Sequence, residues 1–299
     1  MRRLTKPRRK PTLGSPAEFA TEPLKLGGSS GRYDLPTVEA DPDMLVDARI
    51  AATAGTYGAL RITDLALHAE LAPGRLVLHD MSLGLVGGKA KVWASAEPAG
   101  NNTRVSANAA VTAADLQEVV RLLHEGPPML WGHLDGHAAI VMTGTTVPDG
   151  LKASRISGVL TLHDGRVARA LLELASTDLR RMFRKGKGTA RISCLLAVTD
   201  LRNGVGFASP LRLHSSEGMI TGGGRIDLNR RLLDLRLHSD PTSTGFFALD
   251  VPVRITGPFG DPNIVPDLLS AAPARSGEVN LASLPVELET LAQANPCPP

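Results

Sequence analysis

Aromatic side chains are scarce in this chain: two Trp, two Tyr and six Phe make up 3% of its 299 residues. A folded core usually takes much of its buried area from aromatic rings, so Leu, Val, Ile and Ala must supply the core here. Proteins that bind single-stranded nucleic acid stack the bases on aromatic side chains within a basic groove. The scarcity of aromatics therefore argues against a nucleic-acid partner.

Cysteines and long apolar runs are scarce as well. Cys194 and Cys297 are the two cysteines, too few for a disulfide framework or for a structural zinc site without several histidines. They could form one disulfide in an oxidising compartment, and two free thiols are the alternative. The basic start leads into Pro11 and Gly14, and no apolar run reaches 18 residues. We therefore expect neither a signal peptide nor a transmembrane helix in this chain.

Glycine and proline, in contrast, are plentiful at 30 and 22 residues, and they punctuate segments in which apolar and polar residues alternate. Such alternation places apolar side chains on one face of a strand. It is clearest over residues 233–238 and 249–256, with similar units recurring about every ten residues. We predict a mainly β fold with a meandering antiparallel sheet. Its predicted apolar face contains Leu233, Leu235, Leu237, Leu249, Val251, Val253 and Ile255.

A few segments break this alternation. Apolar residues at helical spacing predict a short helix over about residues 112–123, with Thr112 as its N-cap, and a second one from about residue 176. A further short helix is expected near residues 283–292. Three regions result: a disordered basic tail and linker over 1–45, a β-rich domain over 46–267, and a C-terminal tail over 268–299.

Three motifs match catalytic, metal or phosphate sites in part, but the structure predicted around each of them does not suit such a site. Gly27–Gly31 matches a nucleophile elbow in spacing, but it lies in the predicted linker instead of between a strand and a helix. His133 and His137 would stand about 13 Å apart along a strand, too far to share one ion, and only a turn at Asp135-Gly136 would bring them closer. Gly222–Arg225 lacks the spacing and the following helix of a phosphate loop. We expect no enzyme activity, no cofactor and no metal.

Several segments, taken in order, resemble the C-terminal region of the AsmA family of bacterial envelope proteins. The strand T-A-R-I-S-C-L-L-A-V starts at Thr189, the hairpin T-G-G-G-R-I-D-L starts at Thr221, and V-P-V-R-I-T-G-P-F-G-D-P starts at Val251. The resemblance covers residues 46–267. Family members usually begin with a membrane-anchoring helix and a longer N-terminal domain, and neither is recognised in this sequence. We therefore expect either a truncated or split member or a start that lies upstream of this sequence.

The resemblance implies an elongated, curved sheet on the periplasmic side of the inner membrane. It implies a non-enzymatic role in outer-membrane biogenesis and lipid transport, with phospholipid acyl chains held along an apolar groove. An inner-membrane-anchored partner, or a missing N-terminal half, would then supply the membrane attachment. The alternating strands fit a second reading equally well, a closed β-sandwich that serves as a structural or interaction domain without ligand.

Overall fold

The computed structural model describes most of the chain between Leu24 and Cys297. The described residues are 24–26, 34–36, 45–57, 60–123, 130–169, 188–241, 252–259, 261–267, 278–294 and 297. The expected second helix, near residue 176, and the motif Gly27–Gly31 lie outside these ranges.

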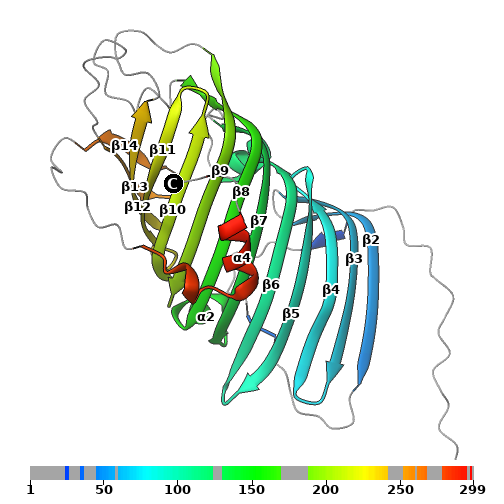
Figure 1. Cartoon of the computed structure of the whole chain (residues 1–299). Helices are drawn as coiled ribbons and strands as arrows, with labels where there is room; N and C mark the ends of the chain where they lie inside the picture. The colour runs from blue at the N-terminus through cyan, green and yellow to red at the C-terminus, as the bar shows by residue number, and fades with distance from the viewer. Residues whose placement is uncertain are drawn as a thin grey trace, which may run out of the picture.

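The described strands form one large sheet in which spatial order follows chain order from β1 to β14 (Figure 1). Every neighbouring pair is antiparallel except β1 and β2, which are parallel. The predicted mainly β, antiparallel meander is confirmed. The strands are β1 (Leu24–Leu26), β2 (Val46–Tyr57), β3 (Leu60–Ala72), β4 (Arg75–Leu85), β5 (Gly88–Ala99), β6 (Asn102–Asp115), β7 (Leu130–Gly144), β8 (Ser154–Ala168), β9 (Thr189–Arg202), β10 (Val205–Ser215), β11 (Gly218–Asp227), β12 (Leu232–Pro241), β13 (Val253–Pro258) and β14 (Asn263–Pro266).

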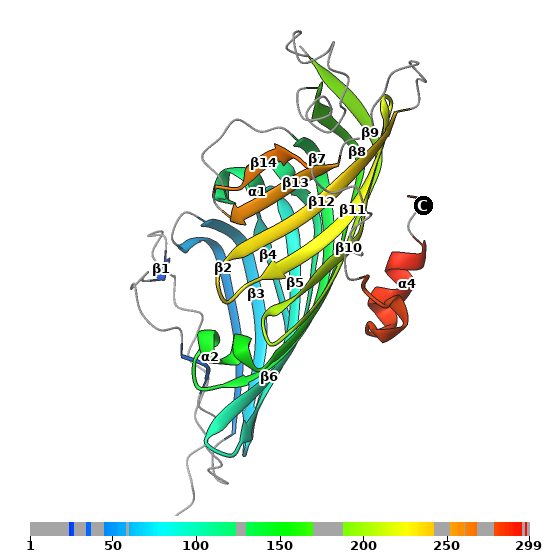
Figure 2. The same cartoon turned by 90° about the vertical axis from the view of Figure 1, so that its left-hand side faces the viewer.

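The sheet is curved, and its two faces carry different helices (Figure 2). Helix α1 (Leu116–Leu123) lies on the concave side, here called the inner face, and helix α4 (Val286–Ala294) lies on the convex side, the outer face. Each helix packs in its own buried apolar cluster. All strands in the described part of the chain belong to this one sheet, so those strands do not form a two-sheet sandwich.

Short turns join consecutive strands, as an up-and-down order requires. Gly74 has φ +67° in the two-residue turn between β3 and β4, and Asn203 and Gly204 both have positive φ between β9 and β10. Asn and Gly adopt this left-handed conformation at low cost, which suits tight hairpins. The local sequence therefore sets the places where the meander reverses.

β-Bulges interrupt the alternation and exchange the faces along a strand. In β9 the pairing with β10 shifts between Ile192 and Cys194, so Ser193 is an extra residue. Ile192 consequently packs in the inner cluster, whereas Cys194 and Leu196 pack in the outer cluster. A count of every second residue would place all three side chains on one face.

The first helix begins later than its sequence pattern predicts. β6 continues through Thr112 to Asp115, because its pairing with β7 extends to Asp115 and His133. Helix α1 then starts at Leu116, and Oδ1 of Asp115 accepts a hydrogen bond from the backbone N–H of Gln117 at 2.8 Å. Thr112 is therefore a strand residue, and the prediction of Thr112 as N-cap is wrong.

Parts of both predicted tails belong to the folded structure. Within residues 1–45, Leu24–Leu26 form β1, and Leu35 is buried near helix α2 (Val147–Lys152). Within residues 268–299, a 3-10 turn at Leu281–Ser283 leads into α4. These segments pair with or pack against the sheet, and the composition of the two tails does not predict these contacts.

Candidate functional site

The inner face of the sheet is apolar from the first long strand onwards. The register shows this in one row of cross-strand neighbours, which runs Ile50, Leu67, Met81, Val92, Ala109, Ala138 and Gly158. Side chains of paired residues point to the same face of a sheet. The row therefore forms an apolar band across seven strands.

Rows on either side of this band have the same character. The inner positions include odd-numbered residues 65–71 of β3, even-numbered residues 90–96 of β5, odd-numbered residues 105–111 of β6, and even-numbered residues 134–142 of β7 and 156–162 of β8. Each of these positions holds Leu, Ile, Val, Met, Ala or Gly. None of them holds a charged residue.

The few hydroxyl groups on the inner face are satisfied by backbone carbonyls. Thr103 donates to the carbonyl oxygen of Pro36 at 2.9 Å, and Ser154 donates to that of Leu151 at 2.8 Å. Thr199 donates to the carbonyl oxygen of Gly158 at 3.5 Å. Since polar atoms with internal partners need no water, these residues do not break the apolar character of the face.

Only part of the inner face is covered by the chain itself. Near α1, Leu162 and Ile192 are fully buried, in a cluster that includes Leu116 of the helix. Away from α1, Leu160 is 41% exposed and Ile50 is 53% exposed. Within the described part of the chain, the apolar inner face therefore continues from the buried cluster to a region that is exposed.

The residues predicted from sequence alternation lie on this face where they are described. Val253 is 3% exposed and belongs to the inner cluster, and Leu237 and Ile255 pack against it. Leu233 and Leu235 share the face of Leu237 on β12. Leu249 and Val251 lie outside the described residues. The register adds that the alternating apolar residues of β2–β8 lie on this same face.

The outer face is polar across β2–β7. Adjacent to the apolar row, it carries Arg49 on β2, His68 on β3, Lys91 on β5 and His137 on β7. His68 Nε2 lies 2.9 Å from Asp47 Oδ1, and the rings of His68 and His79 lie with centroids 4.8 Å apart. Charged groups on this face remain in contact with water, as their solvation requires.

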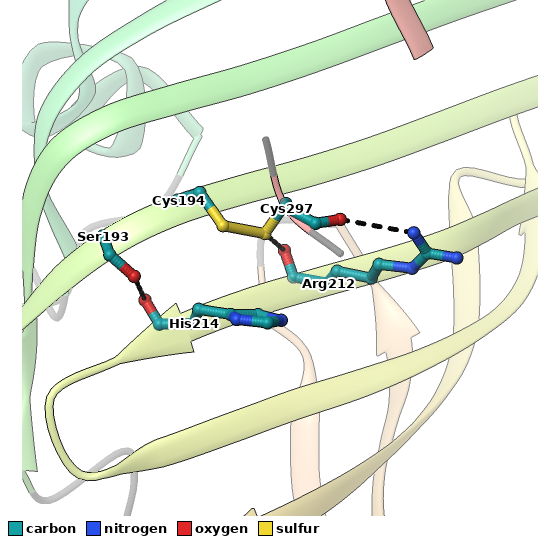
Figure 3. The surroundings of a disulfide bond; sticks show 5 residues. All are labelled: Ser193, Cys194, Arg212, His214 and Cys297. Atoms are coloured by element: carbon teal, nitrogen blue, oxygen red, sulfur yellow. Dashed lines mark hydrogen bonds between the residues drawn. A yellow bond between two sulfur atoms is a disulfide. The ribbon is translucent and has the colours of Figure 1, made fainter. Parts of the chain in front are cut away.

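One apolar patch on the outer face is covered by the C-terminal segment. Leu284, Leu288 and Ala292 pack against Val159, Leu196 and Val198 of β8 and β9. A disulfide joins Cys194 of β9 to Cys297, with their Cα atoms 5.5 Å apart (Figure 3). Arg212 Nη1 donates to the carbonyl oxygen of Cys297 at 3.3 Å, as Figure 3 shows. We call residues 278–294 together with Cys297 the C-terminal strap.

The residues considered for metal or phosphate chemistry do not assemble into a site. His133 and His137 lie on β7, a continuous strand, and the described residues contain no group of three or more His, Cys, Asp or Glu side chains that could hold a metal ion. Gly222 and Gly224 lie within β11, where an added Cβ would collide with backbone carbonyls of β12. These two glycines therefore allow close strand packing.

The described helices include none with the length and apolar character needed to cross a bilayer. Fold and surface together define a class: a single curved antiparallel sheet with an apolar inner face and a polar outer face. Comparison of the chain with family models, curated proteins and solved structures finds no match.

Proposed function

We propose that this protein is a non-enzymatic envelope scaffold of AsmA type that guides phospholipid acyl chains along the inner face of its sheet. The observation that carries the proposal is the uncharged inner face across β2–β8, on which Val46, Ile50 and Leu160 are 40–53% exposed within the described part of the chain. Contiguous apolar surface that a folded chain leaves exposed often marks a binding surface.

Acyl chains match the chemistry of this face. Burial of apolar surface gains about 25 cal/mol per Å², and an acyl chain offers such surface along its whole length. Thr103, Ser154 and Thr199 keep their hydroxyl groups bonded to backbone carbonyls, so an acyl chain would leave no polar atom of these residues without a partner.

The remaining parts of the proposal rest on two supports. The ordered resemblance over residues 46–267 supports a role in outer-membrane biogenesis, with an inner-membrane-anchored partner. The disulfide between Cys194 and Cys297 supports an oxidising compartment such as the periplasm, because such bonds persist there and are rare in the cytosol. The alternative, a closed sandwich without ligand, is less well supported because the described strands form a single sheet.

The test is photo-crosslinking at two positions that differ in the face they occupy. Leu160 on the inner face and Trp93 on the outer face are 41% and 42% exposed, so a photoreactive residue is equally accessible at either. After incubation with phospholipid vesicles, we expect lipid adducts at position 160 and few at position 93, measured by mass spectrometry of the intact protein.

Absence of adducts at position 160, or equal labelling at both positions, would contradict the proposal. Adducts between two protein chains at position 160, without lipid, would instead favour an interaction domain whose inner face binds protein.

A further inference from the structure

Strand β2 lies at an edge of the sheet, and over most of its length it pairs with a strand on one side only. It pairs with β3 from Val46 to Tyr57, and on its other side β1 pairs only with Gly55–Tyr57. Within the described part of the chain, residues 46–54 thus have a neighbouring strand on one side. An edge of this kind presents unpaired backbone N–H and C=O groups to any further strand.

On the inner face of the sheet, the residues of this edge strand are apolar. Val46 and Ile50 are 40% and 53% exposed, and both lie on the inner face, which is buried only near α1 and α2. Ala48 lies between them on the same face. The apolar inner face therefore runs to the edge of the sheet without a polar border.

On the outer face, this edge strand carries two side chains of opposite charge, two residues apart. Asp47 and Arg49 lie on the same face of β2 and are both exposed. The carboxylate of Asp47 contacts His68 and keeps 59% of its side-chain surface exposed. Charges on an edge strand often prevent pairing, yet these two would attract in one particular arrangement.

That arrangement is an antiparallel pairing of β2 with β2 of a second copy, centred on Ala48. Ala48 then faces Ala48 of the second copy, Val46 faces Ile50, and Asp47 faces Arg49, each pair occurring twice by symmetry. The inner face gains apolar cross-strand pairs, and the outer face gains two pairs of opposite charge. One register is therefore favourable on both faces of the sheet.

We propose that two copies of this chain associate through β2 in this register, with a two-fold axis midway between the two copies of Ala48 and perpendicular to the sheet. Paired residues in an antiparallel ladder point to the same face, so both inner faces lie on one side of the combined sheet. The association joins the two apolar faces into one surface. It does not depend on the proposed lipid-guiding function.

The edge is short, so the dimer forms at high protein concentration and is trapped best by cysteine crosslinking. Residues paired across an antiparallel ladder have Cα atoms about 4.5–5.5 Å apart, within reach of a disulfide. We expect Ala48→Cys to give a disulfide-linked dimer on mild oxidation. Ala52→Cys is the matched control: it is on the same face of the same strand, but its two copies would lie about 27 Å apart.

Charge exchange tests the register independently. Arg49→Asp places two carboxylates opposite each other in both pairs, and we expect it to raise the dimer Kd about tenfold. The double variant D47R/R49D restores opposite charges with the positions exchanged, so its Kd should return to within about twofold of the original. Lys91→Asp, on the outer face of the interior strand β5, should leave the Kd unchanged.

Sedimentation velocity over a concentration series measures these constants, and circular dichroism checks that each variant is folded. Equal crosslinking of Ala48→Cys and Ala52→Cys would overturn the register. A Kd that does not respond to Arg49→Asp, or that the double variant does not restore, would overturn the pairing itself. None of these outcomes changes the expected lipid adducts at position 160.

Discussion

Arg254 and Asp234 form a two-point ion pair on the outer face of β12 and β13. Nε of Arg254 lies 2.9 Å from Oδ1 of Asp234, and Nη2 lies 2.7 Å from Oδ2. The pair offsets a local conflict, because Arg254 faces Arg236 directly across the two strands. Arg236 has its own counter-charge in Asp267, with Nε and Oδ2 3.5 Å apart. Two carboxylates therefore accompany the two guanidinium groups.

This pairing makes stability depend on pH. The hydrogen bond from Arg254 holds the pKa of Asp234 below its usual value, and the charges of Arg254 and Arg236 act in the same direction. A lowered pKa in the folded state stabilises the protein above the unfolded-state pKa, and this stability is lost as the pH falls through the folded-state pKa. We expect the pair to contribute about 0.5–1 kcal/mol near neutral pH and almost nothing in strong acid, since both groups are partly exposed.

A double-mutant cycle with Asp234→Asn and Arg254→Gln isolates this contribution, measured by urea unfolding at neutral pH and well below the ordinary Asp pKa of about 3.9. The coupling between the two substitutions should disappear in acid. A coupling energy that is the same at both pH values would show that the pair acts through packing and not through charge.

At the scale of elements, the C-terminal strap packs on the outer face of the sheet. Its helix α4 covers an apolar patch on the outer face, the disulfide holds its end to β9, and the carbonyl oxygen of Ser283 accepts a hydrogen bond from Arg155. Without the strap, Val159, Leu196 and Val198 would be open to water on an otherwise polar face. The strap therefore completes the fold at this site.

Removal of the disulfide should loosen this element. The bond closes a loop with a sequence separation of 103 residues, and a loop of that size predicts a loss of about 2–5 kcal/mol on replacing both cysteines with Ala. We expect faster amide hydrogen exchange in residues 286–294 and increased binding of an apolar dye. Hydrogen exchange resolved by mass spectrometry measures the first effect.

Two substitutions in α4 test the packing while the disulfide stays intact. Leu288 is 4% exposed and Val286 is 78% exposed. Leu288→Ala should lower the free energy of unfolding by about 2–4 kcal/mol, and Val286→Ala by less than about 0.5 kcal/mol. Similar losses from both substitutions would mean that α4 does not pack as described.

At the scale of the whole molecule, a single sheet leaves one face to be covered by something else. α1 covers the inner face near Leu162 and Ile192, and α2 with Leu35 covers part of the end near Met142. The surface between and beyond them contains Leu160 and Ile50, which remain accessible. This division separates a buried core from an apolar surface that the described chain leaves accessible.

The proposed lipid binding predicts that removal of lipid lowers the stability of the protein. A ligand at about 100 times its Kd stabilises the folded state by about 2.7 kcal/mol, which corresponds to a Tm difference of about 4–5 °C for a chain of this size. We expect delipidated protein to regain this difference when a phospholipid is added, as measured by scanning calorimetry.

Leu160→Glu should abolish the gain in Tm on lipid addition, because a carboxylate would have to be desolvated on the inner face. Trp93→Glu, at matched exposure on the outer face, should keep the gain. A gain that persists in Leu160→Glu and disappears in Trp93→Glu would place the lipid on the outer face.

Much of the candidate surface could be predicted from alternation within single strands. Leu233, Leu235 and Leu237 alternate with polar residues, and the structure places them on one face. The segment from Val105 to Val111 carries the same signal more weakly, because small residues such as Ala107 and Ala109 contrast little with Ser106 and Asn108. Its place in the apolar band becomes visible only when its neighbours in β5 and β7 are known.

The sequence by itself determined the class of this fold, because turns and alternating side chains are local properties of the chain. It determined that both cysteines were candidates for a disulfide, but not that they meet. Only the tertiary structure decided which segments share a face, since a single bulge at Ser193 exchanges the two faces of β9. It also brought Cys297 to Cys194 and left the inner face partly open, because both outcomes depend on how distant segments pack.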